Sequence, residues 1–456
     1  MNYEKKCTFV VMERTFSILL AAATAFSIAG CQKAIQPTPK EKEITTFERL
    51  RDVGKEIPNP KITFGDCIPE GSEATLKSIR YVEGKPIYYM DYTAKVDWES
   101  LLTDPEHQTL LFGVTEVTNK VSKALFRGFE PKAPIKGAKG SCSGFICKNS
   151  KGEILNGRNF DGNYGEMVVV FNHNVKPGEH KSVMMTDLNS AQKFSGIEGY
   201  AGDKILLESG KELNVLLRQP ISTVDGMNDA GLVIAGYQLP DFKDDNVPHT
   251  ADQFECKTPR PEGTYQNTGK PQIGFVGLFN LALTKCATVD DVIELLKSYD
   301  YVSLISDLNM HWCVSDSKKW VTLEYWKNEN GKDSLYVFDE EARNYAAQIS
   351  GHEVAYEYLS MENYYYNLVP AVTWFSDPWQ RELGAVIRVH NMMAHYSLVM
   401  DEEEALRVLQ YGNYGIEVSG QVTNWSCVYN SAQRTVHFTV RNQTDRAFTI
   451  DLKKDL

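Results

Sequence analysis

The sequence predicts an α+β fold in which layered sheets dominate and helices are few. Short segments with alternating or Val-rich apolar residues, the pattern of strands, recur from residue 143 onward. Helical spacing is confined to a few stretches, and both patterns occur in runs rather than in strict alternation. The chain has 456 residues, of which 42% are hydrophobic and 24% are charged, an ordinary composition for a globular protein with a sizeable core.

The residues before 142 predict a separate N-terminal piece over 44–141. Within it, Lys61 to Gly65 is strand-like, Arg80 to Thr93 alternates apolar and polar residues about a turn, and Leu110 to Phe126 has helical spacing. The piece ends in a Pro/Gly/Lys-rich stretch over 131–140. Such an exposed linker is the kind of segment that proteases and self-cleavage use.

The residues from 142 onward carry most of the expected elements. Two strands, Ser143 to Cys147 and Ile154 to Asn156, flank Lys151-Gly152, which is typical of a hairpin turn. The other expected strands are 167–172, 233–237, 311–316, 320–326, 334–338, 425–430, 435–441 and 447–452. The expected helices are 275–285, 289–298 with Thr288 as its N-cap, and 402–409.

The first thirty residues predict an export signal. Basic residues precede an apolar run over 16–29, which is too short for an ordinary membrane-spanning helix. The run ends in small residues before Cys31, an arrangement that resembles the bacterial lipobox, in which the cysteine is lipidated and becomes the first mature residue. We expect a lipoprotein signal peptide over 1–30, a tether over 31–43 and an exported, membrane-anchored product, periplasmic or on the cell surface. A plain signal peptide cut elsewhere and a buried N-terminal helix are the alternatives.

The charge and the cysteines exclude several classes of function. The formal net charge is −12 and basic residues do not cluster among aromatic ones, which disfavours a nucleic-acid surface. Of the nine cysteines, seven remain when Cys7 and Cys31 are set aside, and an odd number in an exported chain suggests at least one free thiol. No spacing matches a CxxC pair or a zinc framework, so we expect no metal or other cofactor.

The candidate chemistry lies in two adjacent motifs, GSCSG around Cys142 and GRNFD over 157–161. Arg158 and Asp161 follow Cys142 by 16 and 19 residues. A hairpin between the two motifs returns both side chains to the neighbourhood of the cysteine. A guanidinium beside a cysteine favours the thiolate, which is the nucleophilic form. A carboxylate at the same place can orient an amine.

These motifs resemble those of the linear amide C-N hydrolases, a family of N-terminal nucleophile enzymes that includes bile salt hydrolases, penicillin V acylases, isopenicillin acyltransferases and, more distantly, acid ceramidase and N-acylethanolamine acid amidase. The segment DGMNDAGLVIAG over 225–236 is similar to the family's NExGL segment, and NWSCVYN over 424–430 is similar to its late W-S-x-V-Y-N strand. The resemblance implies a four-layer αββα fold over a catalytic domain at 142–456, with two stacked antiparallel sheets flanked by helices.

The resemblance also implies a role for each site residue. Cys142 is the nucleophile, and cleavage of the bond from Ser141 exposes its α-amine, which acts as the general base. Asp161 holds that amine, and Arg158 favours the thiolate and touches the substrate. The backbone N–H of Gln238 donates to the oxyanion.

The second oxyanion donor and a second arginine are less clearly matched. The side chain of Asn363 is the candidate donor, with Asn367 as its competitor. Bile salt hydrolases have an arginine where this chain has Val422. Arg381 or Arg388 is the candidate substitute.

The same residues also fit simpler structural interpretations. Cysteine is among the most buried residue types, so Cys142 fits a structural thiol. Arg158 and Asp161 fit an ion pair within a hairpin, which contributes little on a surface. We interpret Asn228 as a turn-closing residue and His311 as a core residue rather than as catalytic groups.

The expected function is therefore hydrolysis of carbon–nitrogen bonds in linear, non-peptide amides through a thioester acyl-enzyme. The expected partners are the membrane, through a lipid anchor at Cys31, and a small N-acyl amide such as a conjugated bile acid, an N-acyl amino acid or an N-acyl ethanolamine. Two alternatives remain: an acyltransferase that passes the acyl group to an amine, and a surface lipoprotein that binds ligands without turnover.

Overall fold

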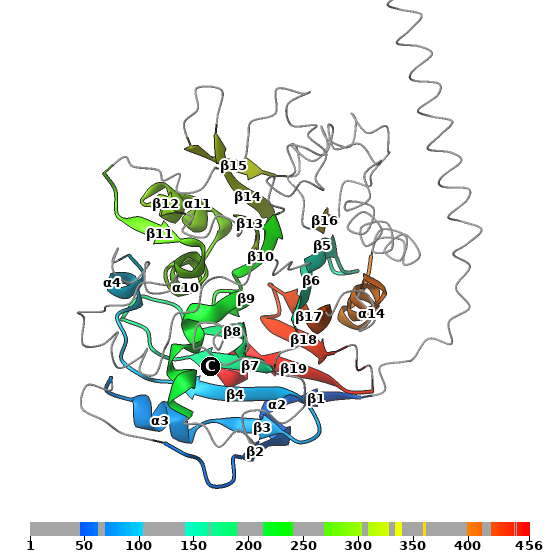
Figure 1. The fold of residues 1–456 in the computed structure, drawn as a ribbon. Coiled ribbons are helices and arrows are strands. Elements are labelled where there is room, and N and C mark those ends of the chain that lie inside the picture. Colours follow the sequence, from blue (N-terminus) through cyan, green and yellow to red (C-terminus); the bar gives the residue numbers. More distant parts are fainter. Residues whose placement is uncertain are drawn as a thin grey trace, which may run out of the picture. The chain divides into compact units, whose positions relative to one another are not determined.

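The fold has the predicted α+β class, with two large sheets packed face to face and helices on their outer faces (Figure 1). In the part of the chain that the structure describes, no helix is long and apolar enough to cross a membrane. The computed structural model describes residues 46–62, 69–103, 142–163, 166–188, 213–239, 269–302, 309–327, 333–339, 359–361, 399–412, 421–441, 443 and 445–456.

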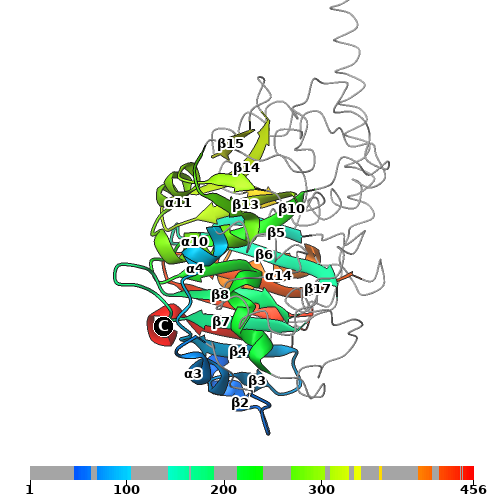
Figure 2. The same ribbon diagram turned by 60° about the vertical axis from the view of Figure 1, so that its left-hand side comes forward.

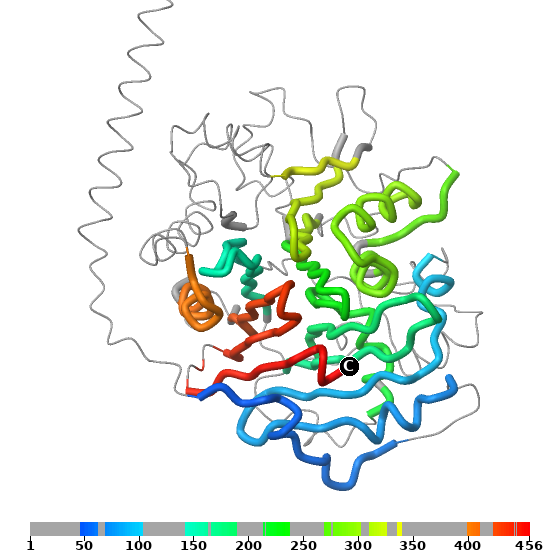
Figure 3. Tube along the Cα trace, turned by 180° about the vertical axis from the view of Figure 1, so that it is seen from behind, coloured from blue at the N-terminus to red at the C-terminus, as the bar shows by residue number. Residues whose placement is uncertain are grey.

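The smaller of the two large sheets contains seven strands among the described residues, in the order β1-β19-β18-β17-β6-β5-β16. Neighbours are antiparallel except β1 and β19, which run parallel and appear as adjacent blue and red traces in Figure 3. The strands are β1 (Phe47–Arg49), β5 (Cys142–Lys148), β6 (Ile154–Asn163), β16 (Leu359–Met361), β17 (Gln421–Asn430), β18 (Thr435–Val440) and β19 (Ala447–Asp451).

The larger sheet contains ten described strands in the order β15-β14-β13-β10-β9-β8-β7-β4-β3-β2. Figure 2 shows β8, β7, β4, β3 and β2 following one another toward one end of it. Only the β4–β7 pair is parallel within the described part of this sheet. The strands are β2 (Gly54–Glu56), β3 (Arg80–Val82), β4 (Ile87–Tyr92), β7 (Met167–Asn172), β8 (Ser182–Asp187), β9 (Thr223–Asn228), β10 (Val233–Leu239), β13 (Asn309–Ser315), β14 (Trp320–Lys327) and β15 (Asp333–Phe338).

The space between the two sheets is an apolar core. Met167 and Phe171 of β7 share one buried cluster with Trp425 of β17 and Phe438 of β18. Val168, which lies between Met167 and Phe171 in the sequence, belongs instead to the cluster on the opposite face of the ten-stranded sheet. Because successive side chains of a strand point to opposite faces, a strand covered on both faces is apolar throughout, as β7 is.

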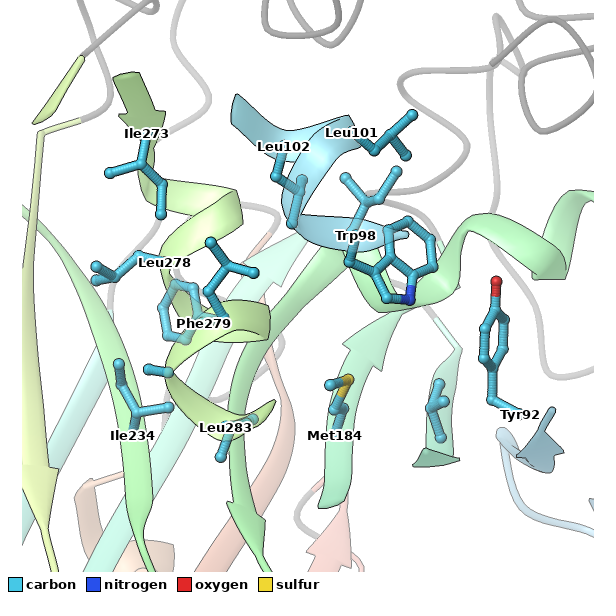
Figure 4. Packing of buried hydrophobic residues seen from close by; sticks show 14 of the residues in the cluster. Tyr92, Trp98, Leu101, Leu102, Met184, Ile234, Ile273, Leu278, Phe279 and Leu283 are labelled. Atoms are coloured by element: carbon cyan, nitrogen blue, oxygen red, sulfur yellow. The ribbon is translucent and has the colours of Figure 1, made fainter. Parts of the chain in front are cut away.

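Helices cover the outer face of each sheet. Over the ten-stranded sheet, Leu278 and Phe279 of α10 lie above Ile234 of β10, and Trp98 of α4 lies nearer Met184 of β8 in the same buried cluster (Figure 4). Over the seven-stranded sheet, α14 packs its apolar face on β5, β6 and β17. The helices on these outer faces are α4 (Trp98–Thr103), the 3-10 helix η1 (Leu213–Ser222), α10 (Phe275–Lys285), α11 (Val289–Lys297) and α14 (Glu402–Gly412). A short parallel strand pair, β11 (Gln272–Gly274) and β12 (Asp300–Val302), adjoins α10 and α11.

The predicted elements after residue 142 are mostly confirmed. The predicted hairpin forms β5 and β6, the Val-rich segment forms β7, and α11 begins with the predicted N-cap, Thr288, whose side chain accepts the N–H of Asp291 in a capping box. The strand predicted at 61–65 is wrong over its described part. Lys61 is irregular there because its carbonyl accepts the N–H of Leu213 at the start of η1. The helix predicted at 110–126 lies outside the described residues.

Residues 46–103 contribute strands to both sheets. β1 extends the seven-stranded sheet, whereas β2, β3 and β4 extend the ten-stranded sheet. The four-residue helix α2 (Leu50–Val53) joins β1 to β2, α3 (Ser72–Lys77) precedes β3, and α15 (Leu452–Asp455) ends the chain. Both oxygens of Glu48 accept from Arg446, at 2.7 Å each. Part of the predicted 44–141 piece is thus paired to strands that lie after Cys142.

Candidate active site

The hairpin of β5 and β6 brings Cys142 and Arg158 together. The side chain of Asn149 accepts the backbone N–H groups of Lys151 and Glu153, each at 3.0 Å, and Gly152 adopts the positive φ that this turn requires. The resulting register pairs Cys142 with Phe160 and Gly144 with Arg158. Residues 142 and 144 share a face of β5, so the 16-residue offset places the guanidinium beside the thiol.

Cys142 is buried, with only 4% of its surface exposed. The Arg158 guanidinium and the backbone N–H of Asp161 both act to lower the pKa of the thiol. Burial raises the pKa of the Cys142 thiol, and the guanidinium of Arg158 opposes that rise without cancelling it. In the uncleaved chain the neutral thiol is therefore favoured, and Arg158 is the group that makes the thiolate easier to form.

Arg158 is fully enclosed between the two sheets. Its Nε donates to Oδ2 of Asp225 at 3.1 Å and its Nη1 donates to the carbonyl of Asn159 at 2.5 Å. Burial lowers the pKa of Arg158, but its interactions with the ionisable Cys142 and with the Asp225 carboxylate raise it by more. The guanidinium therefore stays protonated in an apolar environment.

Asp225 is the counter-charge that the sequence interpretation did not assign. It lies on β9, where it is buried, and its carboxylate also accepts Trp425 Nε1 at 3.2 Å and the hydroxyl of Tyr429. The sequence does contain a signal of this role, because Asp225 and Met227 are two residues apart on one strand and therefore share the face that lines the core. A carboxylate on a core face requires a buried partner, and the buried Arg158 is that partner.

Asp161 lies on the same strand as Arg158 and is also buried. The hydroxyl of Thr423, its partner across β17, donates to Oδ1 of Asp161. Thr423 was not predicted, because nothing in the sequence links it to a residue so far away in the chain. This hydrogen bond fixes the carboxylate at the same end of the hairpin as Cys142, which pairs with the neighbouring residue, Phe160.

The central asparagine of the GRNFD motif organises the opposite face of β6. Asn159 donates to the hydroxyl of Ser143 and to the carbonyl of Leu409, both at 2.9 Å, and accepts from Ser426 at 2.7 Å. It therefore ties β6 to both neighbouring strands and to α14. Its role in the motif is to fix the position of β6, the strand that carries Arg158 and Asp161.

Only part of the expected oxyanion site lies in the described residues. The backbone of Gln238 lies in β10, paired with Met310 of β13. Asn363, its competitor Asn367, and the alternative arginines Arg381 and Arg388 lie outside the described residues, as do Cys31 and Ser141.

The structural interpretations of two other residues are confirmed. Asn228 is the buried last residue of β9, where it closes the turn that follows: it donates to the carbonyls of Leu283 and Cys286 and accepts the N–H groups of Ala230 and Leu232. His311 is fully buried beside Glu324, with Nδ1 3.1 Å from Oε1. Among the described residues, no group of three or more His, Cys, Asp or Glu side chains is arranged to hold a metal ion.

Two stacked sheets with helices on their outer faces thus hold a buried cysteine and a buried arginine at the head of one hairpin. Residues 142–366 match the model of the linear amide C-N hydrolases, choloylglycine hydrolase family, and this part of the chain belongs to that family. The protein is accordingly a hydrolase of linear amide carbon–nitrogen bonds other than peptide bonds. A comparison with curated proteins gave no match.

Several solved structures are similar to this chain at low sequence identity. A mutant of the conjugated bile acid hydrolase from Clostridium perfringens is 15% identical with a TM-score of 0.41, over 69% of this chain and 93% of that one. Penicillin V acylase from Agrobacterium tumefaciens is 14% identical with a TM-score of 0.39, over 69% and 87%. The Caenorhabditis elegans ortholog of N-acylethanolamine-hydrolyzing acid amidase is 13% identical with a TM-score of 0.34, over 66% and 99%.

Proposed function

We propose that this protein hydrolyses small N-acyl amides through a thioester formed at Cys142. Candidate substrates are conjugated bile acids, N-acyl amino acids and N-acyl ethanolamines. The observation that carries the proposal is the buried Arg158 guanidinium, which the hairpin places beside Cys142, the first residue of β5, separated by Ser141 from the linker over 131–140. A thiol supported by a guanidinium is suited to attack an amide carbonyl.

The proposed reaction begins when the bond between Ser141 and Cys142 is cleaved and the α-amine of Cys142 becomes free. That amine takes the thiol proton while sulfur attacks the amide carbonyl, and then gives the proton to the departing amine as the carbon–nitrogen bond breaks. Water next attacks the thioester, loses a proton to the same amine, and releases the carboxylic acid and the thiol. Asp161 would hold the amine, and the backbone N–H of Gln238 with the side chain of Asn363 would donate to both oxyanions.

Replacing one cysteine at a time tests the nucleophile. Cys142→Ala should abolish hydrolysis of a panel of bile salts, penicillin V, N-acyl amino acids and N-acyl ethanolamines. Cys147→Ala is the matched control, because Cys147 is a buried thiol of the same strand that packs in the core against α14. Hydrolysis that survives in Cys142→Ala would refute the proposal. A new amide formed faster than acid when an amine is supplied would identify an acyltransferase instead.

We also propose that the residues before Cys142 stay bound after cleavage as a small subunit. The proposal is supported by the pairing of β4 with β7 and of β1 with β19, and by the ion pair between Glu48 and Arg446. Intact mass and N-terminal sequencing should find a fragment that begins at Cys142 and elutes together with the preceding fragment. A single uncleaved chain with full activity would exclude the α-amine as base.

Export and lipidation at Cys31 are a further part of the proposed function, supported by the lipobox-like sequence. Cys31→Ala should abolish incorporation of labelled palmitate and release the protein from the membrane fraction of a bacterial host. Cys7→Ala, which changes a cysteine inside the predicted signal peptide, should leave both unchanged. Labelling that persists in Cys31→Ala would refute the anchor.

A further inference from the structure

The aromatic ring of Tyr237 covers the guanidinium that supports Cys142. Tyr237 lies on β10, directly before Gln238, and its side chain is buried in a cluster that also contains Cys142. The guanidinium carbon of Arg158 lies 4.7 Å from the centre of the Tyr237 ring, within the range of a cation–π contact. The ring of Phe160 is farther, at 5.4 Å. The Tyr237 ring is therefore the nearer aromatic contact of the guanidinium.

The neighbouring residues hold the ring in this position. His311, across the strand pair from Tyr237, contacts it edge to face with ring centres 5.5 Å apart, and His311 is itself held by Glu324. On the other side stands Gly144, where an added Cβ would lie 2.2 Å from the Tyr237 hydroxyl. That distance is impossible for two atoms that are not bonded, so residue 144 must lack a side chain for the ring to reach Arg158.

The hydroxyl of Tyr237 contributes no hydrogen bond to this arrangement. It is buried and has no hydrogen-bond partner among the described residues. Burial also raises the pKa of Tyr237, so the phenol stays neutral and does not compete with Cys142 for the charge of Arg158. The ring face is thus the part of Tyr237 that meets the site.

We propose that Tyr237 is a positioning residue, whose ring holds the Arg158 guanidinium against Cys142 without touching the substrate. Asp225 binds Arg158 through Nε and the Asn159 carbonyl accepts from Nη1, both in hydrogen bonds to single nitrogens. The ring adds contact across the plane of the group and so limits its tilt. This inference rests on the proposed role of Cys142 as nucleophile.

The acidity of the Cys142 thiol is the property that this positioning controls. The charged groups that act on the thiol among the described residues are Arg158 and Asp161 of β6. Tyr237 of β10 packs in the same buried cluster as Cys142. If the ring is lost, the guanidinium is free to move away from the sulfur and supports the thiolate less. We expect the pKa of the thiol to rise by about one unit, and alkylation at neutral pH to slow about tenfold.

Two substitutions at Tyr237 separate the ring from the hydroxyl. The rate at which iodoacetamide alkylates Cys142 is measured against pH in the purified protein, with the modified peptide quantified by mass spectrometry. Tyr237→Leu should shift the profile to higher pH, whereas Tyr237→Phe should keep it. Tyr325→Leu is the matched control: Tyr325 is a buried tyrosine of β14 in the cluster beneath α10, and its loss should leave the profile unchanged. Tyr237→Met, which fills the space without a ring, replaces Tyr237→Leu if that variant does not fold.

The outcomes separate this inference from the proposed function. A shift in Tyr237→Phe equal to that in Tyr237→Leu would mean that the hydroxyl acts, and an unshifted profile in Tyr237→Leu would mean that the ring does not hold Arg158. Either result overturns the inference. Both leave the proposed function intact, since that is tested by hydrolysis in Cys142→Ala.

Discussion

Replacing Asp225 by asparagine tests how the buried Arg158 is held. Oδ2 of Asp225 accepts from Arg158 and Trp425, and Oδ1 accepts from Tyr429. An asparagine keeps the shape but has one oxygen and one NH₂ group, so its oxygen can serve Arg158 and Trp425 only if the NH₂ faces Tyr429, whose hydroxyl must then accept instead of donate. The variant also leaves the positive charge of Arg158 without its partner.

The expected loss of stability follows from burial. The side chains of Arg158 and Asp225 are 1% and 0% exposed, and removing one partner of such a pair destabilises a protein by about 3–5 kcal/mol. The ion pair of Arg51 and Asp91 provides a comparison, because its side chains are 20% and 34% exposed. Solvent screens that pair, so Asp91→Asn should cost about 1–2 kcal/mol.

Urea unfolding followed by tryptophan fluorescence measures both variants. Asp225→Asn should lower the free energy of unfolding at least twice as much as Asp91→Asn. If the two variants lose the same stability, or if Asp225→Asn loses less than about 1 kcal/mol, the reasoning from burial is wrong.

Three further outcomes are expected. Arg158→Met should raise the pKa of the Cys142 thiol by about 1–3 units, read from the pH profile of alkylation, and an unchanged profile would contradict the contact between them. Asn228→Ala removes four hydrogen bonds to backbone groups and should cost about 3 kcal/mol in urea unfolding while leaving that profile unchanged. A shifted profile would give Asn228 a role in the site. Acid should weaken the attachment of residues 46–103, because Arg446 lowers the pKa of Glu48 in the folded state. The stabilisation by ionised Glu48 is present above the ordinary carboxyl pKa of about 4 and is lost as the pH falls below that value. In gel filtration the cleaved fragment should therefore separate more readily at pH 3 than at pH 7, and the opposite order would contradict this prediction.

The strands that sequence could predict are those whose pattern is local. β5, β6 and β7 combine alternating or Val-rich residues with a turn whose chemistry is explicit at Asn149 and Gly152. β8 and β9 were missed for a physical reason. β8 is buried on both faces like β7, so it does not alternate, but it lacks the run of valines that marks β7. β9 carries the polar residues Asp225 and Asn228 inside the core.

The candidate site divides in the same way. The spacing within one hairpin predicts that Arg158 lies near Cys142, and the structure places them in contact. Asp225 and Thr423 reach the same cluster from strands 67 and 262 residues away from their partners in the chain. Such contacts depend on how the two sheets stack. The residue pattern within one segment carries no information about that stacking.

The short connection through α2 limits how the two sheets can move. Phe47–Arg49 is hydrogen-bonded into one sheet and Gly54–Glu56 into the other, with four residues between them. A shear of one sheet across the other would have to break one of these pairings, since four residues have little slack to give. The side chains that meet across the interface near Cys142, Arg158 from one sheet and Asp225 from the other, therefore stay in register while substrates come and go.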